Sequence, residues 1–534
     1  MVACPLSSSA HSDSCRETDG ETLRANETNE PSGSAETTTL RGAVLLILIL
    51  AVAWACVGQR LLQRPFWMDE LHSWLLITDP DVEHAMSALA DGADYNPPTY
   101  YLVARLLKLF GPITEFRLRL LSLGVTVSTL LAVYLMLVRR FSITASLGAT
   151  LAAAGHPLLI LQATEARFYA LWLCLLMWYC WLLTSRIPTT AAGWKRTAGL
   201  MFLAAAICTT HYFGMISVGL VTAAWAAVHR RDRSVIRQSA GLMVVVGTTV
   251  AACLPMLKGQ QAALTCATWV KSPTIAGSFD FMTQFVPALP LAICLCCAAA
   301  AWFMRQQTTT SIHSGSFRND APWSVENSVL ASLLLHPLVL ITFSWLVQPA
   351  LIDRYAIVSV VGTVPVYVWL LSKSTLVMQR SAVGVAGTLL VLSIQHGADT
   401  WDYSLHQQQT LQQSLNELPA DCVVVFEDRI DFWLLQHQTA PARHWYQVDF
   451  ETSDLLRSSN LRIVQRDVGR RIAKWYPDRF PMMPLQELND ASQVVVVPYR
   501  NHYVGQLKYP ETFCTKRLSN GLIRLTRNPE MIRL

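Results

Sequence analysis

Charged residues are scarce in this sequence of 534 residues, in which Asp, Glu, Lys and Arg together make up 15% of the chain. Soluble proteins contain about a quarter of such residues, so an ordinary soluble protein is excluded. Hydrophobic residues make up 52%, and the 17 Trp residues are of a type that gathers at membrane–water interfaces. The formal net charge of +5 identifies no partner, and we expect no nucleic acid among the partners. The composition predicts a polytopic membrane protein.

Nucleotide-binding motifs are also missing. The sequence has no Walker A loop, no Gly-rich dinucleotide fingerprint and no Gly-x-Ser-x-Gly nucleophile elbow. The 13 cysteines include no pair of Cys-x-x-Cys motifs, and no His/Cys cluster has the spacing of metal ligands. Cys422 and Cys514 lie in a polar C-terminal part, where they either pair or stay free. Eight further cysteines lie in apolar runs and are predicted to be buried in the membrane. They are Cys56, Cys174, Cys180, Cys208, Cys253, Cys294, Cys296 and Cys297.

The N-terminal residues 1–41 are rich in Ser, Thr, Glu and Gly and contain few large apolar side chains. They predict a disordered cytoplasmic tail, followed by an uncleaved hydrophobic anchor in place of a cleavable signal peptide. A membrane-spanning helix needs roughly 17–25 residues, and about eleven apolar runs follow, the sixth of them short. The runs lie near 42–59, 118–138, 143–161, 168–184, 197–214, 215–229, 239–257, 285–304, 329–347, 355–372 and 381–396.

Arg and Lys are distributed unevenly between these runs. With the N-terminus in the cytoplasm, the cytoplasmic gaps hold most of the basic residues, as the positive-inside rule requires. The first outer loop is an exception, and we expect surface helices in it. Asp79 and Pro80 are predicted to begin one helix that ends at Ala90, and Pro97–Pro98 to begin another. The basic residues of the cytoplasmic gaps are Arg139, Arg140, Arg186, Lys195, Arg196, Arg230, Arg231, Arg233, Arg237, Arg305, Arg318, Lys373 and Arg380.

The chain therefore divides into the tail, a transmembrane domain at 42–396 with its first outer loop at 60–117, and a C-terminal part at 397–534. An odd number of spans places this last part outside the cytoplasm. Charges return in it, and its apolar runs are short, which predicts a small extracytoplasmic α/β domain. The predicted strands are Val423–Phe426 and Val494–Val497, and the predicted helices are Ile430–His437 and Arg462–Trp475.

Polar residues that flank the spans at the outer face are the candidates for chemistry, because a charge beside a membrane span is costly. Neighbours in a helix point about 100° apart, so only one acid of the pair Asp69–Glu70 can address a reacting atom, as a base or a metal ligand. The alternative is a solvated acid pair on a loop. The candidates that topology brings to one face are Asp69, Glu70, Glu165, Arg167, His211, Tyr212, Asp353, Arg354 and Tyr355.

Two of these candidates suit a phosphate. The guanidinium groups of Arg167 and Arg354 stay charged and can bind phosphate oxygens through two hydrogen bonds. The alternatives are snorkelling to the membrane surface, or ion pairs with Glu165 and Asp353 respectively. For His211, which ends a span, the alternative is a structural or interfacial role.

Several short motifs resemble the membrane glycosyltransferases of the GT-C fold. The closest branch is the dolichyl-phosphate-mannose–protein mannosyltransferase-like family, which includes bacterial aminoarabinose transferases. The similarity extends over roughly 42–396. The motifs are Trp67-Met68-Asp69-Glu70, Asn96-Pro97-Pro98-Thr99-Tyr100-Tyr101, Phe116-Arg117-Leu118-Arg119, Glu165-Ala166-Arg167-Phe168-Tyr169-Ala170-Leu171 and Arg354-Tyr355.

The resemblance implies an inverting transfer of a sugar from a polyprenyl-phosphate carrier to a lipid, glycan or protein acceptor outside the cytoplasm. Asp69 takes the place of the family's acid, as acceptor base or orienting group, with Glu70 beside it. Arg167 and Arg354 fall where basic residues bind the carrier phosphate. A bacterial inner-membrane location is expected. The other residues assigned to substrate binding are Asn96, Tyr100, Glu165, Tyr169, His211, Tyr212 and Tyr355.

One departure from the family concerns metal binding. Many members have His where this chain has Asn96, and an amide is a poor metal ligand, so a divalent metal is not indicated and no cofactor is assigned. Two other functions remain open from the residues alone. A transporter or flippase of lipid-linked glycans requires polar residues at mid-membrane, where the runs are nearly uncharged. A non-catalytic scaffold that displays the outer domain assigns no role to Asp69 and Arg167.

Overall fold

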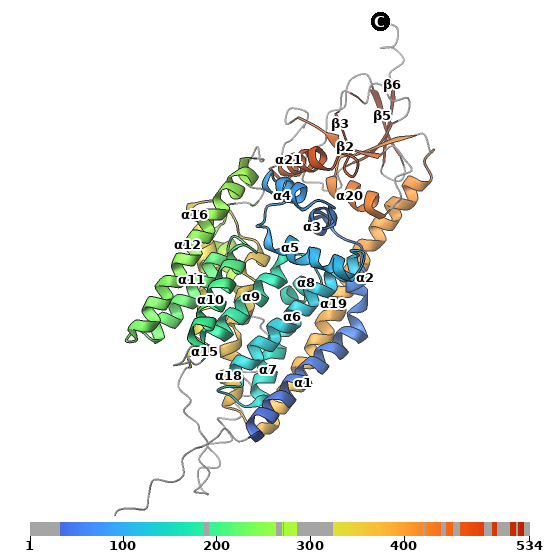
Figure 1. The fold of residues 1–534 in the computed structure, drawn as a ribbon. Coiled ribbons are helices and arrows are strands. Elements are labelled where there is room, and N and C mark those ends of the chain that lie inside the picture. Colours follow the sequence, from blue (N-terminus) through green and yellow to red (C-terminus); the bar gives the residue numbers. More distant parts are fainter. Residues whose placement is uncertain are drawn as a thin grey trace, which may run out of the picture.

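The computed structural model describes residues 33–185, 192–262, 270, 272–285, 324–419, 422–438, 445–451, 460–484, 487, 494–498, 513–518 and 522–527. A bundle of long helices carries a layer of short helices at one end, and a small sheet domain lies beyond that layer (Figure 1). The short helices come from the first outer loop and the sheet from the C-terminal part. The prediction of a mostly helical chain with a C-terminal α/β domain is confirmed.

The helices of the bundle coincide with the apolar runs of the sequence. Among the described residues, six helices are long and apolar enough to span a membrane, or seven if one bent pair counts as a span, so the count of about eleven is not confirmed. The run at 285–304, with Cys294, Cys296 and Cys297, lies outside the described residues except for Phe285. The bounds are α1 (Gly33–Val57), α2 (Gln59–Gln63), α6 (Glu115–Leu137), α7 (Ile143–Ala154), α8 (Pro157–Ala163), α9 (Phe168–Leu183), α10 (Ala192–Cys208), α11 (Gly214–Val228), α12 (Arg233–Ala262), α13 (Ile275–Thr283), α15 (Val325–Ser332), η2 (Leu333–Leu335), α16 (His336–Leu346), η3 (Asp353–Ala356), α17 (Val358–Gly362), α18 (Val364–Ser372) and α19 (Leu376–Asn416).

Helix α1 begins at Gly33, inside the segment predicted to be disordered. That prediction was wrong for residues 33–41, because the backbone hydrogen bonds of the apolar helix continue into the polar residues that precede it. The part that qualifies as a membrane span is Thr37–Val57. Residues 1–32 lie outside the described residues.

The run predicted at 143–161 is not one straight span. Helix α7 ends at Ala154 and α8 begins at Pro157, with an angle of 74° between them. Proline cannot donate the hydrogen bond that continues a helix, but it suits the first turn of a new one. His156 caps that turn by accepting a backbone N–H at 3.2 Å. The break leads the chain into the turn at 164–167, where two of the candidate residues lie.

The first loop, residues 60–117, forms helices, as predicted. The N-cap of the first predicted helix is Asp81, whose carboxylate accepts the Glu83 N–H at 2.8 Å. The assignment of this cap to Asp79 was wrong, because the Asp79 carboxylate binds His84 at 2.6 Å and Tyr476 at 2.7 Å instead. The bounds are α3 (Met68–Thr78), α4 (Val82–Ala90), α5 (Thr99–Arg105), which begins directly after the predicted Pro97–Pro98 pair, and η1 (Leu106–Phe110).

The C-terminal domain is a six-stranded mixed sheet with strand order β3-β2-β1-β4-β6-β5. The two valine-rich strands of the sequence prediction, β1 and β4, are confirmed and pair in parallel at its centre. Strands β1 to β4 are parallel, and β6 pairs antiparallel with β4 and β5. The bounds are β1 (Val423–Phe426), α20 (Arg429–Gln438), β2 (Trp445–Asp449), α21 (Asn460–Trp475), β3 (Met482–Pro484), β4 (Val494–Val497), β5 (Phe513–Arg517) and β6 (Ile523–Arg527).

Cys422 and Cys514 do not form a disulfide with each other. Cys422 precedes β1, whereas Cys514 lies on β5, and β4 and β6 separate the two strands. Neighbouring strands lie about 4.8 Å apart, so three strand spacings exceed the Cα separation of about 4.4–6.8 Å that a disulfide allows.

The C-terminal domain rests on the loop helices. Arg471, Lys474 and Trp475 of α21 donate hydrogen bonds to the carboxylate of Asp91, which follows α4, at 3.2, 2.6 and 2.8 Å. These contacts hold the sheet domain over α3 to α5 (Figure 1). The surface helices of the first loop are therefore covered on one side by the bundle and on the other by the C-terminal domain.

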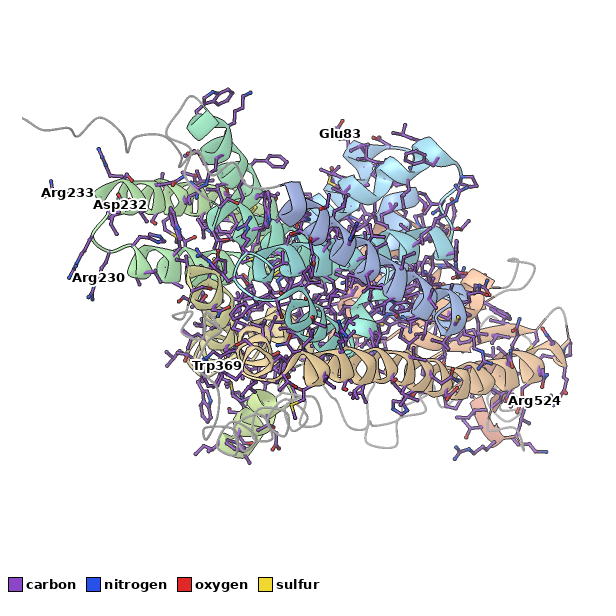
Figure 2. The ribbon with its side chains drawn as sticks, turned by 90° about the horizontal axis from the view of Figure 1, so that it is seen from below. Glu83, Arg230, Asp232, Arg233, Trp369 and Arg524 are labelled. Atoms are coloured by element: carbon purple, nitrogen blue, oxygen red, sulfur yellow. The ribbon has the colours of Figure 1, made fainter. Side chains whose placement is uncertain are left out.

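Basic residues mark the opposite end of the bundle. Arg230, Asp232 and Arg233 project from the turn between α11 and α12 (Figure 2). The far end of α12 lies at the loop helices, where Gln260 donates to the main-chain oxygen of Leu89 at 3.1 Å. A helix of 30 residues is about 45 Å long, so this basic turn and the first outer loop lie at opposite ends of the bundle.

Candidate active site

The acid pair at the start of α3 divides into two environments. Glu70 is fully buried, and Arg119 donates to its two carboxylate oxygens from Nε at 2.9 Å and from Nη2 at 2.6 Å. The same oxygens accept the backbone N–H groups of Ala166 at 2.8 Å and Trp67 at 3.1 Å. These bonds occupy the carboxylate of Glu70 and join α3, α6 and the turn after α8. The catalytic role of Glu70 stays a prediction, and this arrangement does not favour it.

Asp69 faces in a different direction and is partly accessible. Its carboxylate pairs with Arg354 at 2.9 Å, and its side chain is 14% exposed. Its main-chain oxygen accepts a hydrogen bond from Arg167 at 2.7 Å. Burial raises the pKa of Asp69, but the nearby charges of Arg354 and Arg167 outweigh this effect and hold the pKa below its ordinary value. Arg354 thus pairs with Asp69, not with the predicted alternative Asp353, which accepts from Gln284 at 3.1 Å.

Arg167 pairs with a carboxylate that was not among the predicted site residues. Its Nη1 and Nη2 donate to Asp94 at 2.6 and 3.4 Å. Tyr101 and Asn96 donate to the same carboxylate at 2.7 and 3.0 Å. Burial opposes ionisation of Asp94, but the Arg167 charge prevails and lowers its pKa to about 2. Arg167 is therefore neutralised by Asp94 and not by the predicted alternative Glu165.

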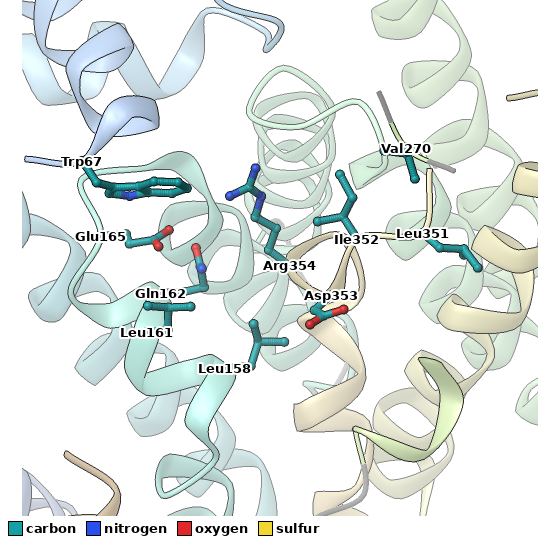
Figure 3. Close-up of a pocket in the computed structure, with 10 residues that line it drawn as sticks. All are labelled: Trp67, Leu158, Leu161, Gln162, Glu165, Val270, Leu351, Ile352, Asp353 and Arg354. Atoms are coloured by element: carbon teal, nitrogen blue, oxygen red, sulfur yellow. The ribbon is translucent and has the colours of Figure 1, made fainter. Parts of the chain in front are cut away.

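A cavity of about 590 Å³ lies beside the Asp69–Arg354 pair. Its size falls within the range of about 300–1,000 Å³ typical of small-molecule sites. Trp67, Gln162 and Glu165 line one side, and Arg354 projects between them and Ile352 (Figure 3). The remaining walls are mostly apolar. The lining residues are Trp67, Leu158, Leu161, Gln162, Glu165, Val270, Leu351, Ile352, Asp353 and Arg354.

Several polar atoms on this cavity have no hydrogen-bond partner among the described residues. They are Trp67 Nε1 and Arg354 Nε, which donate, and Gln162 Oε1 and Glu165 Oε2. Burial raises the pKa of Glu165 to about 7 against the opposing charges of Arg64 and Arg354, so its carboxyl group exchanges a proton near neutral pH. Buried polar atoms are normally satisfied, and this set matches a ligand that offers donors and acceptors together.

Aromatic residues pack around Arg354. The Tyr169 ring lies 5.7 Å from its guanidinium carbon, and the Trp67 ring lies 5.6 Å from it on the outer-loop side. Tyr355 and His211 complete this cluster, with ring centroids 5.3 Å apart. The rings hold the cation at the cavity, which is a favourable arrangement for a guanidinium. The structure thus brings Tyr169, His211 and Tyr355 together, as predicted.

The other predicted substrate residues lie away from the cavity. Tyr212 donates to Gln260 at 2.8 Å, on α12. Tyr100 is buried against Phe168, with ring centroids 6.4 Å apart. Asn96 binds Asp94, as described above. These three residues are not lining residues of the described cavity, and neither are Arg167, Tyr169, His211 and Tyr355.

Several residues of the site, including Trp67 and Gln162 on the cavity, were not predicted as site residues from the sequence. Asp94 precedes Asn96 by two positions, and its place beside that motif is the signal that could have found it. Arg119 is a charged residue at the start of an apolar run, which already marks it as paired or functional. Arg429, from the C-terminal domain, is buried beside Met68, and no local pattern indicates it. Among the described residues, no three His, Cys, Asp or Glu side chains group as metal ligands.

A solved structure shares this architecture. The crystal structure of ArnT from Cupriavidus metallidurans bound to undecaprenyl phosphate aligns with a TM-score of 0.54 and 13% identity, over 90% of this chain and 97% of that chain. ArnT from the same organism in the apo state aligns over the same shares at 12% identity, with a TM-score of 0.39. No protein-family model matches the sequence, and no curated protein matches it. The GT-C resemblance is therefore confirmed at the level of the fold.

Proposed function

We propose that this chain, which has the GT-C fold, moves a sugar from a polyprenyl-phosphate carrier to an acceptor hydroxyl at the extracytoplasmic face of a bacterial inner membrane. The observation that carries the proposal is the Asp69–Arg354 pair beside a cavity of about 590 Å³ with apolar walls. A structural neighbour holds undecaprenyl phosphate, and a carrier of this kind fits a chain without nucleotide motifs.

The two charged groups have complementary roles in the proposed transfer. The acceptor oxygen attacks the anomeric carbon of the sugar as the bond from that carbon to the carrier phosphate breaks. The phosphate oxygen keeps the electron pair, and Arg354 stabilises its charge through the Nε that lacks a partner among the described residues. Asp69 accepts the hydroxyl proton. Attack from the face opposite the phosphate inverts the anomeric centre.

The environment of Asp69 specifies the timing of proton transfer. Because the pKa of this carboxylate is lowered, Asp69 is a weak base toward a free alcohol. It first orients the hydroxyl through a hydrogen bond and takes the proton as the new bond to carbon forms and acidifies the oxygen. An oxocarbenium-like transition state, typical of glycosyl transfer, requires little nucleophile activation before attack.

The cavity side chains are assigned to the sugar. Gln162 and Glu165 offer hydrogen-bond acceptors, and Trp67 offers an N–H donor. The hydroxyl groups of a sugar ring can bind all three. Arg167 acts through Asp69 and not on the phosphate, since it holds the main-chain oxygen of Asp69 while it is paired with Asp94. Arg354 therefore provides the phosphate contact, and Arg167 is a positioning residue.

Transfer from radiolabelled polyprenyl-phosphate sugar in membranes tests this assignment. Asp69→Asn should lower the transfer rate by about 10²–10⁴, the range for loss of a general base, and Arg354→Gln should weaken carrier binding. Glu83→Gln serves as the control, because Glu83 is an exposed acid of the same loop. Full activity of Asp69→Asn together with unchanged carrier affinity of Arg354→Gln would refute the proposal.

A further inference from the structure

Arg429 reaches the site from the C-terminal domain. It is the first residue of α20 and follows β1 closely, at the carboxyl edge of the parallel strands. Its side chain is only 4% exposed, and its Nη2 lies 3.0 Å from the sulfur of Met68. Met68 precedes Asp69 in the first turn of α3, so α20 presents a cation to the N-terminus of the helix that bears the acceptor base.

This guanidinium lacks adequate partners. Its Nε and Nη1 are buried without a hydrogen-bond partner among the described residues, and a thioether is only a weak acceptor. Burial lowers the pKa of Arg429 to about 10, so it is charged at neutral pH. An uncompensated buried charge is strongly unfavourable, and each buried donor left unsatisfied adds to this cost.

Two of the neighbouring acids already pair with other arginines. Asp69 pairs with Arg354 at 2.9 Å, and Asp94 pairs with Arg167 at 2.6 Å. Both acids act on Arg429 through their charge, as does the adjacent Asp428, but neither Asp69 nor Asp94 accepts a hydrogen bond from it in the described part of the chain. Arg429 is therefore a buried cation with unfilled donors at the seam between α20 and α3, and these donors point to a ligand.

We propose that Arg429 binds an oxyanion, a phosphate or carboxylate group of a substrate, at the seam between the C-terminal domain and α3. An oxyanion can replace the Met68 sulfur at Nη2 and form a second bond to Nε or Nη1, which gives the two-bond geometry that guanidinium groups favour. The inference rests on the proposed function, because it makes the C-terminal domain complete the substrate site beside Asp69. The oxyanion comes either from the carrier phosphate or from an acidic group of the acceptor.

Binding of two probes to the full chain in nanodiscs tests the inference. Inorganic phosphate is titrated in an Arg354→Gln background, so that the measured phosphate affinity reports on Arg429 without a contribution from Arg354. Adding Arg429→Gln should weaken phosphate binding at least tenfold, and Arg429→Lys, which keeps the charge but not the planar fork, should give a smaller loss. Arg479→Gln is the matched control, since Arg479 is an exposed arginine of the same domain that binds Thr78 at 3.2 Å.

Undecaprenyl phosphate, titrated with Arg354 intact, identifies the source of the oxyanion. If Arg429→Gln binds undecaprenyl phosphate tenfold more weakly, the oxyanion is the carrier phosphate. If its affinity for undecaprenyl phosphate is unchanged but inorganic phosphate binding is lost, the oxyanion is an acidic group of the acceptor. Unchanged affinity for both probes in Arg429→Gln and Arg429→Lys overturns the inference. Failure of the proposed function gives a different result, namely full transfer activity of Asp69→Asn together with unchanged undecaprenyl-phosphate affinity of Arg354→Gln. Arg429→Lys decides the question if Arg429→Gln does not fold.

Discussion

Replacement of Asp94 by Asn tests whether the Asp94–Arg167 pair holds the site together. Asp94 is 5% exposed, and its carboxylate accepts hydrogen bonds from Arg167, Tyr101 and Asn96. Its pKa of about 2 against a reference of 3.8 corresponds to roughly 2 kcal/mol of stability that depends on its charge. Removing one partner of a buried ion pair costs about 3–5 kcal/mol, because the remaining cation is left uncompensated. We therefore expect Asp94→Asn to destabilise the protein by about 3 kcal/mol, between these two values.

A double-mutant cycle separates the ion pair from the rest of the network. The free energy of unfolding is measured by SDS titration in mixed micelles for Asp94→Asn, Arg167→Met and the double variant. We expect the double variant to be less destabilised than the sum of the single variants by at least about 1 kcal/mol, since contacting charges couple in this way. Additive effects, or a loss below about 0.5 kcal/mol in Asp94→Asn, would refute the assignment of this pair as a structural element of the site.

The pH dependence of the same pair has a definite sign. The folded-state pKa of Asp94 is depressed, so its contribution is fully present above the unfolded value of about 3.9. It is lost as pH falls from about 4 toward 2. The stability difference between the wild type and Asp94→Asn should therefore be constant at neutral pH and shrink below about pH 4. A difference that persists unchanged at about pH 2 would contradict the charge-based explanation.

The site and the topology support three further predictions. The affinity for the carrier should fall as pH rises through about 7, because the Glu165 carboxyl group then ionises beside an anionic phosphate. In Glu165→Gln the affinity should change with pH only through the ionisation of the carrier phosphate itself. Glu70→Gln should lower the transfer rate without changing its pH profile, because Glu70 positions the Glu165–Arg167 turn through Ala166. A shifted pH profile would instead indicate that Glu70 itself transfers a proton. In a cysteine-free background, Glu451→Cys should be labelled by an impermeant reagent from outside and Asp232→Cys only from inside, and the reverse pattern would overturn the proposed orientation.

The apolar runs and short valine runs predict the main elements of the fold directly from the amino-acid sequence. A run that must satisfy its backbone hydrogen bonds internally in lipid has to be a helix, so the apolar parts of Glu115–Leu137 and Leu376–Asn416 follow from composition alone. Val423–Phe426 and Val494–Val497 were predicted with their observed ends, because β-branched residues bounded by polar segments leave few other conformations. Caps and helix ends were less certain, as Gly33 and Asp79 show, since they depend on neighbours outside the local window.

The motifs also named the sequence positions at which the site forms, since Glu165 and Arg354 lie at predicted span ends and Asp69 lies in the first loop. The sequence did not predict which charged residues pair with one another. Arg167 meets Asp94 over 73 positions, and Arg119 meets Glu70 over 49. Local pairing with Glu165 and Asp353 is favoured by proximity in sequence, but the tertiary structure points these acids elsewhere. Nearest neighbours in sequence are therefore poor guides to ion pairs that close a fold.

Arg429 and Met68 are 361 positions apart, and their contact exists only because the C-terminal domain docks on the first-loop helices. The amino-acid sequence was sufficient to specify a membrane-embedded helical chain, a C-terminal α/β domain and a short set of candidate charges, because hydrophobic periodicity and desolvation act locally. Three features of the site required the folded chain: Asp69 is accessible while Glu70 is not, Arg167 is neutralised by Asp94, and the C-terminal domain adds a cation beside α3. Burial and pairing depend on what packs around each side chain, which no single stretch of sequence contains.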